Sequence, residues 1–167
     1  MTPVSAPLSL ALAFIAGWGI VGLAGLLKPT SVKFAGRILF AVGAVCGLGV
    51  AVAGAWATAA PPGEIVLPVG LPDLPFHLRL DALSGFFLLL LGAASVGISL
   101  FGAGYFRVAQ GTPPGLLCLQ YHVFLAAMAL VLLADDAYAF MIAWEVMALA
   151  SWLLVTTQHR LPAIRQA

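Results

Sequence analysis

Five long apolar segments decide what this chain can fold into. They cover residues 8–27, 38–60, 82–105, 116–134 and 137–157, and charged residues or Pro/Gly clusters separate them. A helix needs about 20 apolar residues to cross a hydrocarbon core of about 30 Å. Only 8% of the residues are charged, against roughly 25% in a soluble globular domain. The sequence therefore predicts an all-α membrane protein, a bundle of five transmembrane helices forming a single transmembrane domain.

Most positive charges fall on one side of this predicted bundle. They are Lys28, Lys33, Arg37, Arg107, Arg160 and Arg165, whereas the other side carries Arg79 among acidic residues. Since Lys and Arg are retained on the cytoplasmic side, we expect the N-terminus outside and the C-terminus inside. The residues before Leu8 contain no Lys or Arg, so the first segment is expected to remain as a helix rather than to be a cleaved signal peptide.

Residues 61–80 form the only connecting segment that is long enough to build structure outside the membrane. A β-rich piece at 65–69 and an alternating piece at 76–80 flank a Pro/Gly turn region. This pattern predicts a short extracytoplasmic β-hairpin-like segment between the second and third helices. Asp81, with Ser84 three residues later, suits a cap for the third helix, where its charge favours the positive end of the dipole. Asp135 and Asp136 predict a tight acidic turn between the last two helices.

Small residues recur at helical spacing in the first two segments. Gly43 and Gly47 lie one turn apart on the second segment, and Gly17, Gly22 and Gly25 lie on the first. Small side chains let helix backbones approach closely in lipid, where the hydrophobic effect does not drive helices together. The pattern indicates a compact bundle and specifies no function.

Glu145 is the one residue with a carboxylic acid side chain inside a predicted span. It lies about 12 Å into the fifth segment at 1.5 Å per residue, close to the bilayer middle. A carboxylate there costs at least a few kcal/mol, so it must be protonated, paired or facing water. Proton transfer is the role that this placement favours, and a protonated, purely structural glutamate is the alternative. A helical wheel puts it on one face with other residues of the segment: Tyr138, Met141, Ala148, Leu149, Trp152 and Thr156.

Other candidate residues point to no further chemistry. Trp144, Tyr138, Ser151 and Thr156 are candidates for supporting polar or packing roles near Glu145. His77 and His122 lack a second ligand in the sequence, and Cys46 and Cys118 show no metal or disulfide spacing. We expect no metal, no cofactor and no catalytic redox site in this chain. Its net charge of +1 argues against nucleic acid as a partner.

Two stretches resemble a known family of membrane subunits. They are Leu67-Pro-Val-Gly-Leu-Pro-Asp-Leu-Pro-Phe-His-Leu-Arg-Leu-Asp-Ala-Leu-Ser-Gly-Phe-Phe87 and Ala143-Trp-Glu-Val-Met-Ala-Leu-Ala-Ser-Trp-Leu-Leu-Val155. They are similar to hydrogenase-4 component B and formate hydrogenlyase subunit 3, within the antiporter-like subunits of complex I and the Mrp antiporters. The resemblance runs from about Leu8 to the C-terminus. Family members have many more spans, so this chain resembles their N-terminal part.

The resemblance implies a membrane subunit of a proton-translocating hydrogenase or NADH:quinone oxidoreductase-type complex. Such a subunit lies in the cell inner (plasma) membrane, contacts other membrane subunits, and couples electron transfer elsewhere to proton movement. Glu145 matches the family's fifth-helix glutamate, which works with a lysine on a later helix. Lys28 and Lys33 lie in a loop, and Ala148 replaces a frequent Ser or Thr. Two alternatives stay open: a structural scaffold without proton transfer, and a cation/proton antiporter component.

Overall fold

The computed structural model describes residues 5–71, 74–105 and 112–158. Five helices in this part of the chain are long and apolar enough to cross a membrane. Their bounds are α1 Ala6–Ala24, α2 Phe40–Ala57, α3 Ala82–Tyr105, α4 Pro114–Leu133 and α5 Ala137–Val155. Short 3₁₀ turns, η1 Gly25–Leu27 and η3 Thr156–Gln158, continue α1 and α5. The prediction of five helices that are long and apolar enough to span a membrane is confirmed.

The second span begins earlier than the sequence predicts. A π-helical stretch, η2 Lys33–Leu39, leads directly into α2, whereas the apolar pattern placed the start at residue 38. The difference arises because a hydropathy pattern stops at charge, while backbone hydrogen bonding does not. Lys33 and Arg37 can lie on a helix end when their long side chains reach the polar region beyond the hydrocarbon.

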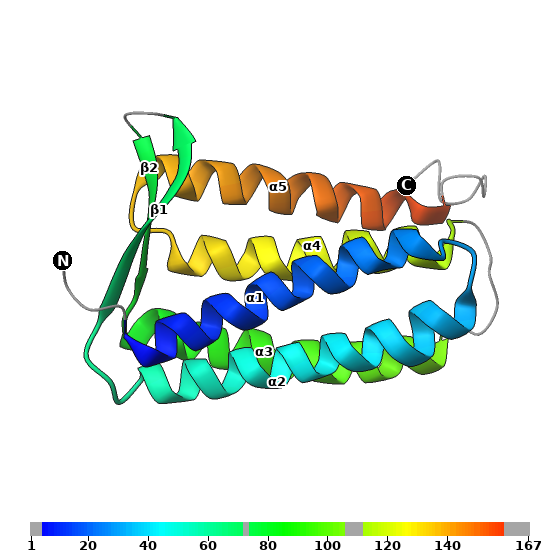
Figure 1. Cartoon of the computed structure of the whole chain (residues 1–167), viewed down its shortest axis with the longest axis horizontal. Coiled ribbons are helices and arrows are strands. Elements are labelled where there is room, and N and C mark those ends of the chain that lie inside the picture. Colours follow the sequence, from blue (N-terminus) through cyan, green and yellow to red (C-terminus); the bar gives the residue numbers. More distant parts are fainter. Residues whose placement is uncertain (1–4, 72–73, 106–111, 159–167) are drawn as a thin grey trace.

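The helices run side by side, and each reverses the direction of the one before (Figure 1). In that view α2 and α3 lie together along one edge, α5 lies along the other, and α4 and α1 lie between them. The shared core is formed mainly by α1, α2 and α4, with side chains such as Leu8, Trp18 and Val50 fully buried. This arrangement leaves α5 at one side of the bundle, packed mainly against α4.

The predicted hairpin is present at one end of the bundle. Strands β1 Gly63–Leu71 and β2 Leu74–Leu80 pair antiparallel, from Gly63 opposite Leu80 to Leu71 opposite Leu74. The register shifts between Leu67 and Gly70, and Gly70 has a φ of 120°, which a residue with a Cβ rarely adopts. Figure 1 shows the hairpin extending across this end from α2 and α3 toward the start of α5. We call this the hairpin end.

The two ends of the bundle carry different charges. The hairpin end holds Glu64, Arg79, Asp81, Asp135 and Asp136, and the α1–α2 connection at the opposite end holds Lys28, Lys33 and Arg37. This division agrees with the charge asymmetry on which the predicted orientation rests. Arg107, Arg160 and Arg165, which the orientation prediction also used, lie outside the described residues.

Small residues make the close helix contacts that the sequence predicts, in two different ways. Gly92 and Gly54 bring the backbones of α2 and α3 together, and Gly25 of η1 meets Gly115 of α4. Gly43 and Gly47 also leave room for polar side chains of other helices. A Cβ at Gly43 would overlap His122 Nε2 of α4, and one at Gly47 would overlap Ser95 Oγ of α3.

Candidate functional site on the fifth helix

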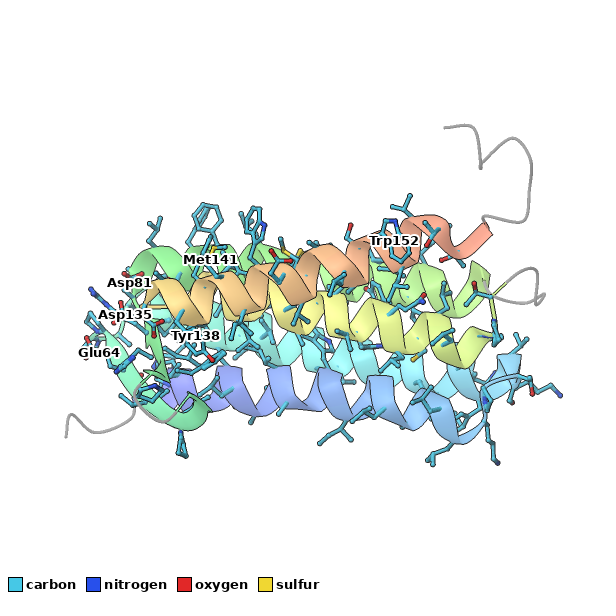
Figure 2. All side chains as sticks on the ribbon, turned by 90° about the horizontal axis from the view of Figure 1, so that it is seen from above. Glu64, Asp81, Asp135, Tyr138, Met141 and Trp152 are labelled. Carbon is cyan, nitrogen blue, oxygen red and sulfur yellow. The ribbon has the colours of Figure 1, made fainter. Side chains whose placement is uncertain are left out.

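Glu145 lies on the outward face of α5. Its side chain is exposed and makes no hydrogen bond or ion pair with another described residue. Leu149, one turn further on, is 60% exposed, and Trp152 is 62% exposed. Figure 2 looks onto α5 from outside the bundle, with Met141 and Trp152 on the helix nearest the viewer. Within the described chain, the carboxylate therefore faces away from the core.

The helix that carries Glu145 is the least buried of the five. Only 17% of its most apolar window is buried, against 28% to 56% for the other four. Its buried residues are all alanines: Ala139, Ala143 and Ala150. Because an ionised carboxylate in hydrocarbon costs about 3 kcal/mol or more, an uncovered Glu145 in a bilayer is expected to need water or a polar group from outside the described bundle.

The residues predicted to support Glu145 have other contacts. Tyr138 meets Phe76 of the hairpin edge to face, with ring centroids 5.5 Å apart, and Trp144 stacks on Phe140 at 5.6 Å. Thr156 Oγ1 donates to the Trp152 carbonyl at 2.8 Å. Ser151 is half-buried. The structure thus places Tyr138 and Thr156 near opposite ends of α5, and it does not bring them together with Glu145.

A second group of polar side chains lies inside the bundle, and the sequence analysis assigned no role to it. His122 is fully buried, its Nδ1 lies 2.8 Å from the Cys118 carbonyl, and its Nε2 has no hydrogen-bond partner among the described residues. Because a carbonyl only accepts hydrogen bonds, Nδ1 carries the proton and Nε2 is a bare acceptor. Tyr121 Oη lies 3.1 Å from Ser99 Oγ, which is also fully buried. Polar residues within apolar segments are the signal that marks this group.

Two aspartates at the hairpin end begin helices. Asp81 Oδ1 accepts the Ser84 N–H at 2.9 Å, and Asp136 Oδ1 accepts the Ala139 N–H at 2.7 Å. These are the contacts of N-caps. The Ser84 backbone bond is the main cause that lowers the pKa of Asp81 below its usual value. The Ala139 and His77 backbone bonds lower the pKa of Asp136 in the same way.

Both caps are expected to hold at neutral pH and to fail in acid. A carboxylate with a lowered pKa in the folded state stabilises it above the ordinary value of about 3.9, and this stability is lost as the pH falls through the lowered pKa. Exchange of the Ser84 and Ala139 amide protons, measured by mass spectrometry between pH 7 and pH 3, should show loss of protection only below about pH 4. The exchange rates are corrected for the intrinsic effect of pH on amide exchange, and an amide in the middle of a helix serves as the reference. Loss of protection near pH 6 would contradict the assigned caps.

The described residues contain no group of three or more His, Cys, Asp or Glu side chains that could hold a metal ion. Cys46 and Cys118 are buried, free thiols.

Comparison with known proteins gives partial relatives. No family model matches the chain. An uncharacterized protein of Mycobacterium tuberculosis is 35% identical over 83% of the chain, and hydrogenase-4 component B of Escherichia coli is 33% identical over 49%. NADH-quinone oxidoreductase subunit L of Mycobacterium tuberculosis is 30% identical over 60%. The chain spans about a fifth or less of these relatives, namely 21%, 12% and 16% of their lengths. The similarity supports the predicted resemblance to complex I-like, antiporter-like subunits over part of the chain.

Proposed function

We propose that this chain is the N-terminal part of a membrane subunit in a proton-translocating hydrogenase or NADH:quinone oxidoreductase-type complex. The relatives named for such complexes support the class of assembly. The complex would lie in the cell inner (plasma) membrane, and its other membrane subunits would be the partners of this chain. In this proposal, electron transfer takes place elsewhere in the complex and is coupled to proton movement through this subunit.

The observation that carries the proposal is the position of Glu145. It lies near the middle of α5, on the face that this bundle leaves uncovered. A carboxylic acid in this place can take up a proton when it meets a hydrated path and release it when a neighbouring charge changes. Further polypeptide packed on this uncovered face would complete the proton path.

Replacement of Glu145 tests this role directly. Glu145→Gln keeps the shape of the side chain and removes the titratable group, so proton translocation by the assembled complex should fall to the level of membranes lacking the chain. The measurement is acidification of inverted membrane vesicles, followed with a pH-sensitive dye, while hydrogen, formate or NADH is offered as electron donor. Electron transfer and the amount of assembled complex are measured in the same vesicles.

The control is Glu64→Gln, which makes the same chemical change at an exposed residue of the hairpin. It should leave acidification unchanged. Normal acidification with Glu145→Gln would contradict the proposal and support a structural scaffold. Cation-dependent proton flux in vesicles that contain this chain alone would support the cation/proton antiporter alternative.

A further inference from the structure

The turn between α4 and α5 is hydrogen-bonded to the hairpin. Asp135 N–H donates to the His77 carbonyl at 3.0 Å, and His77 N–H donates to Asp136 Oδ2 at 2.9 Å. Leu78 and Ala134 form an antiparallel bridge beside these bonds. The turn therefore continues the two-stranded sheet for a short distance, and it joins residues 59 positions apart.

Asp136 makes a bond with each of its carboxylate oxygens. Oδ1 caps α5 through the Ala139 N–H. Oδ2 accepts the His77 N–H and lies 3.0 Å from His77 Nδ1. We call the bonds of Oδ2 the Asp136–His77 contact. One carboxylate thus ties the first turn of α5 to strand β2.

The other charged side chains around this contact form weak ion pairs with one another. Arg79 lies 3.9 Å from Asp135 and 3.9 Å from Asp81, and all three side chains are substantially exposed. Exposed ion pairs of this kind contribute between zero and about 1 kcal/mol. The backbone bonds are directional, and they place Asp136 at one position relative to β2.

Packing fixes the position of α5 less firmly than that of the other helices. Its fully buried side chains are alanines, and among the helices it packs mainly against one neighbour, α4. Its position therefore depends on one helix interface and on the bonds at the hairpin end. Since a helix is rigid over a few turns, the position of its first turn also sets that of Glu145, about 14 Å further along the axis.

We propose that Asp136 and His77 are positioning residues, which connect the hairpin to α5 and set the depth and rotation at which Glu145 lies in the membrane. The importance of Glu145 for proton transfer rests on the proposed function. The effect on the position of α5 does not depend on it.

Asp136→Asn separates the two bonds of this residue. Asparagine is as good an N-cap as aspartate, but its amide NH₂ cannot accept the His77 N–H. The variant should keep Ala139 protected from amide exchange and increase the exchange of His77. The matched control is Asp135→Asn, where the side chain accepts no backbone bond and only the 3.9 Å contact with Arg79 is weakened.

The depth of α5 is then measured in lipid vesicles with the whole chain. A nitroxide is attached through Leu149→Cys, which is exposed and one turn beyond Glu145, after the two native cysteines are replaced by alanine. Collision rates with oxygen and with a water-soluble relaxation agent report its depth. Asp136→Asn should move the label by at least one residue rise, about 1.5 Å. Asp135→Asn should leave the label at residue 149 in place. A reference label attached through Leu48→Cys on α2 should keep its depth in both variants.

Each outcome decides the proposal. An unchanged depth together with faster exchange at His77 would mean that the contact is local and does not position α5. Unchanged exchange at both His77 and Ala139 would mean that the Asp136–His77 bond is not formed, because the single amide oxygen of asparagine can accept only one of the two N–H groups. If Asp136→Asn fails to fold, His77→Ala keeps the backbone bond and removes the imidazole, and a smaller movement of the label is then expected. These readouts do not involve proton flux, so failure of the proposed function gives a different result.

Discussion

Gly92→Ala should destabilise this bundle strongly. A Cβ at this position would lie 2.5 Å from the Ala51 nitrogen and 2.6 Å from the Gly47 carbonyl oxygen. Both atoms belong to the backbone of α2, so neither can move unless α2 and α3 separate along their contact. Overpacking typically costs 1 to 3 kcal/mol, and a backbone obstacle favours the upper part of this range. We expect a loss of about 3 kcal/mol in the free energy of unfolding.

The measurement is reversible unfolding of the purified chain in mixed micelles with increasing denaturing detergent, followed by circular dichroism. Gly97→Ala is the control, because it makes the same change on α3 where no atom lies within 4 Å of the new Cβ. Alanine has the better helix propensity, so Gly97→Ala should stabilise the chain by up to about 1 kcal/mol. Equal stability of the two variants would show that α2 and α3 do not touch at Gly92.

Gly43→Ala should also destabilise the bundle strongly. Here the obstacle to the new Cβ is a side chain rather than a backbone. The new Cβ would overlap His122 Nε2, and the imidazole has no free space because it is fully buried and held by the Cys118 carbonyl. The Gly43 carbonyl also accepts the Trp18 indole N–H at 3.0 Å. A shift of α2 at this point would break that bond and leave buried polar groups unpaired, at a cost of about 1 to 3 kcal/mol.

A double-mutant cycle identifies the cause of this effect. His122→Ala removes the obstacle, so Gly43→Ala should cost much less in the His122→Ala background than in the native chain. Gly19→Ala on α1, where nothing lies within 4 Å, gives the intrinsic effect of the substitution. Additive losses would contradict the packing of His122 against Gly43.

The helices could be predicted from the sequence because the formation of each helix depends only on the residues within its own segment. A run of about 20 apolar residues forms a helix in lipid whatever its neighbours are, since its backbone groups must be satisfied within the segment. The predicted third segment, 82–105, coincides with α3. The hairpin was predictable for a similar reason, because alternating residues and Pro/Gly turn signals are also local.

The glycines show where such reasoning ends. Gly43 and Gly47 have the spacing typical of close backbone packing, and the structure places a side chain against each of them. Residues one turn apart share a face of the helix, but their spacing does not say which helix meets that face or what it presents. His122 and Ser95 come from α4 and α3, and only the folded bundle brings them to α2.

Glu145 shows the same division within the candidate site. An ionisable residue inside an apolar segment is visible from the sequence, and this was enough to select it. Its exposure on the outward face follows from how α5 packs on α4, which depends on alanines at the contact and on the position of the whole helix. The contact of Asp136 with His77 was not predicted, because the two residues lie 59 positions apart in different segments, and the sequence does not show how those segments meet.

The sequence by itself thus determined the number of spans, their order and the one carboxylic acid within them, since the hydrophobic effect and backbone satisfaction act on each segment separately. The tertiary structure decided which faces are covered, which polar groups meet inside the bundle, and which residues tie the hairpin to α5. These contacts join residues far apart in the chain, and they form only when helices that are stable in lipid on their own find complementary faces on one another.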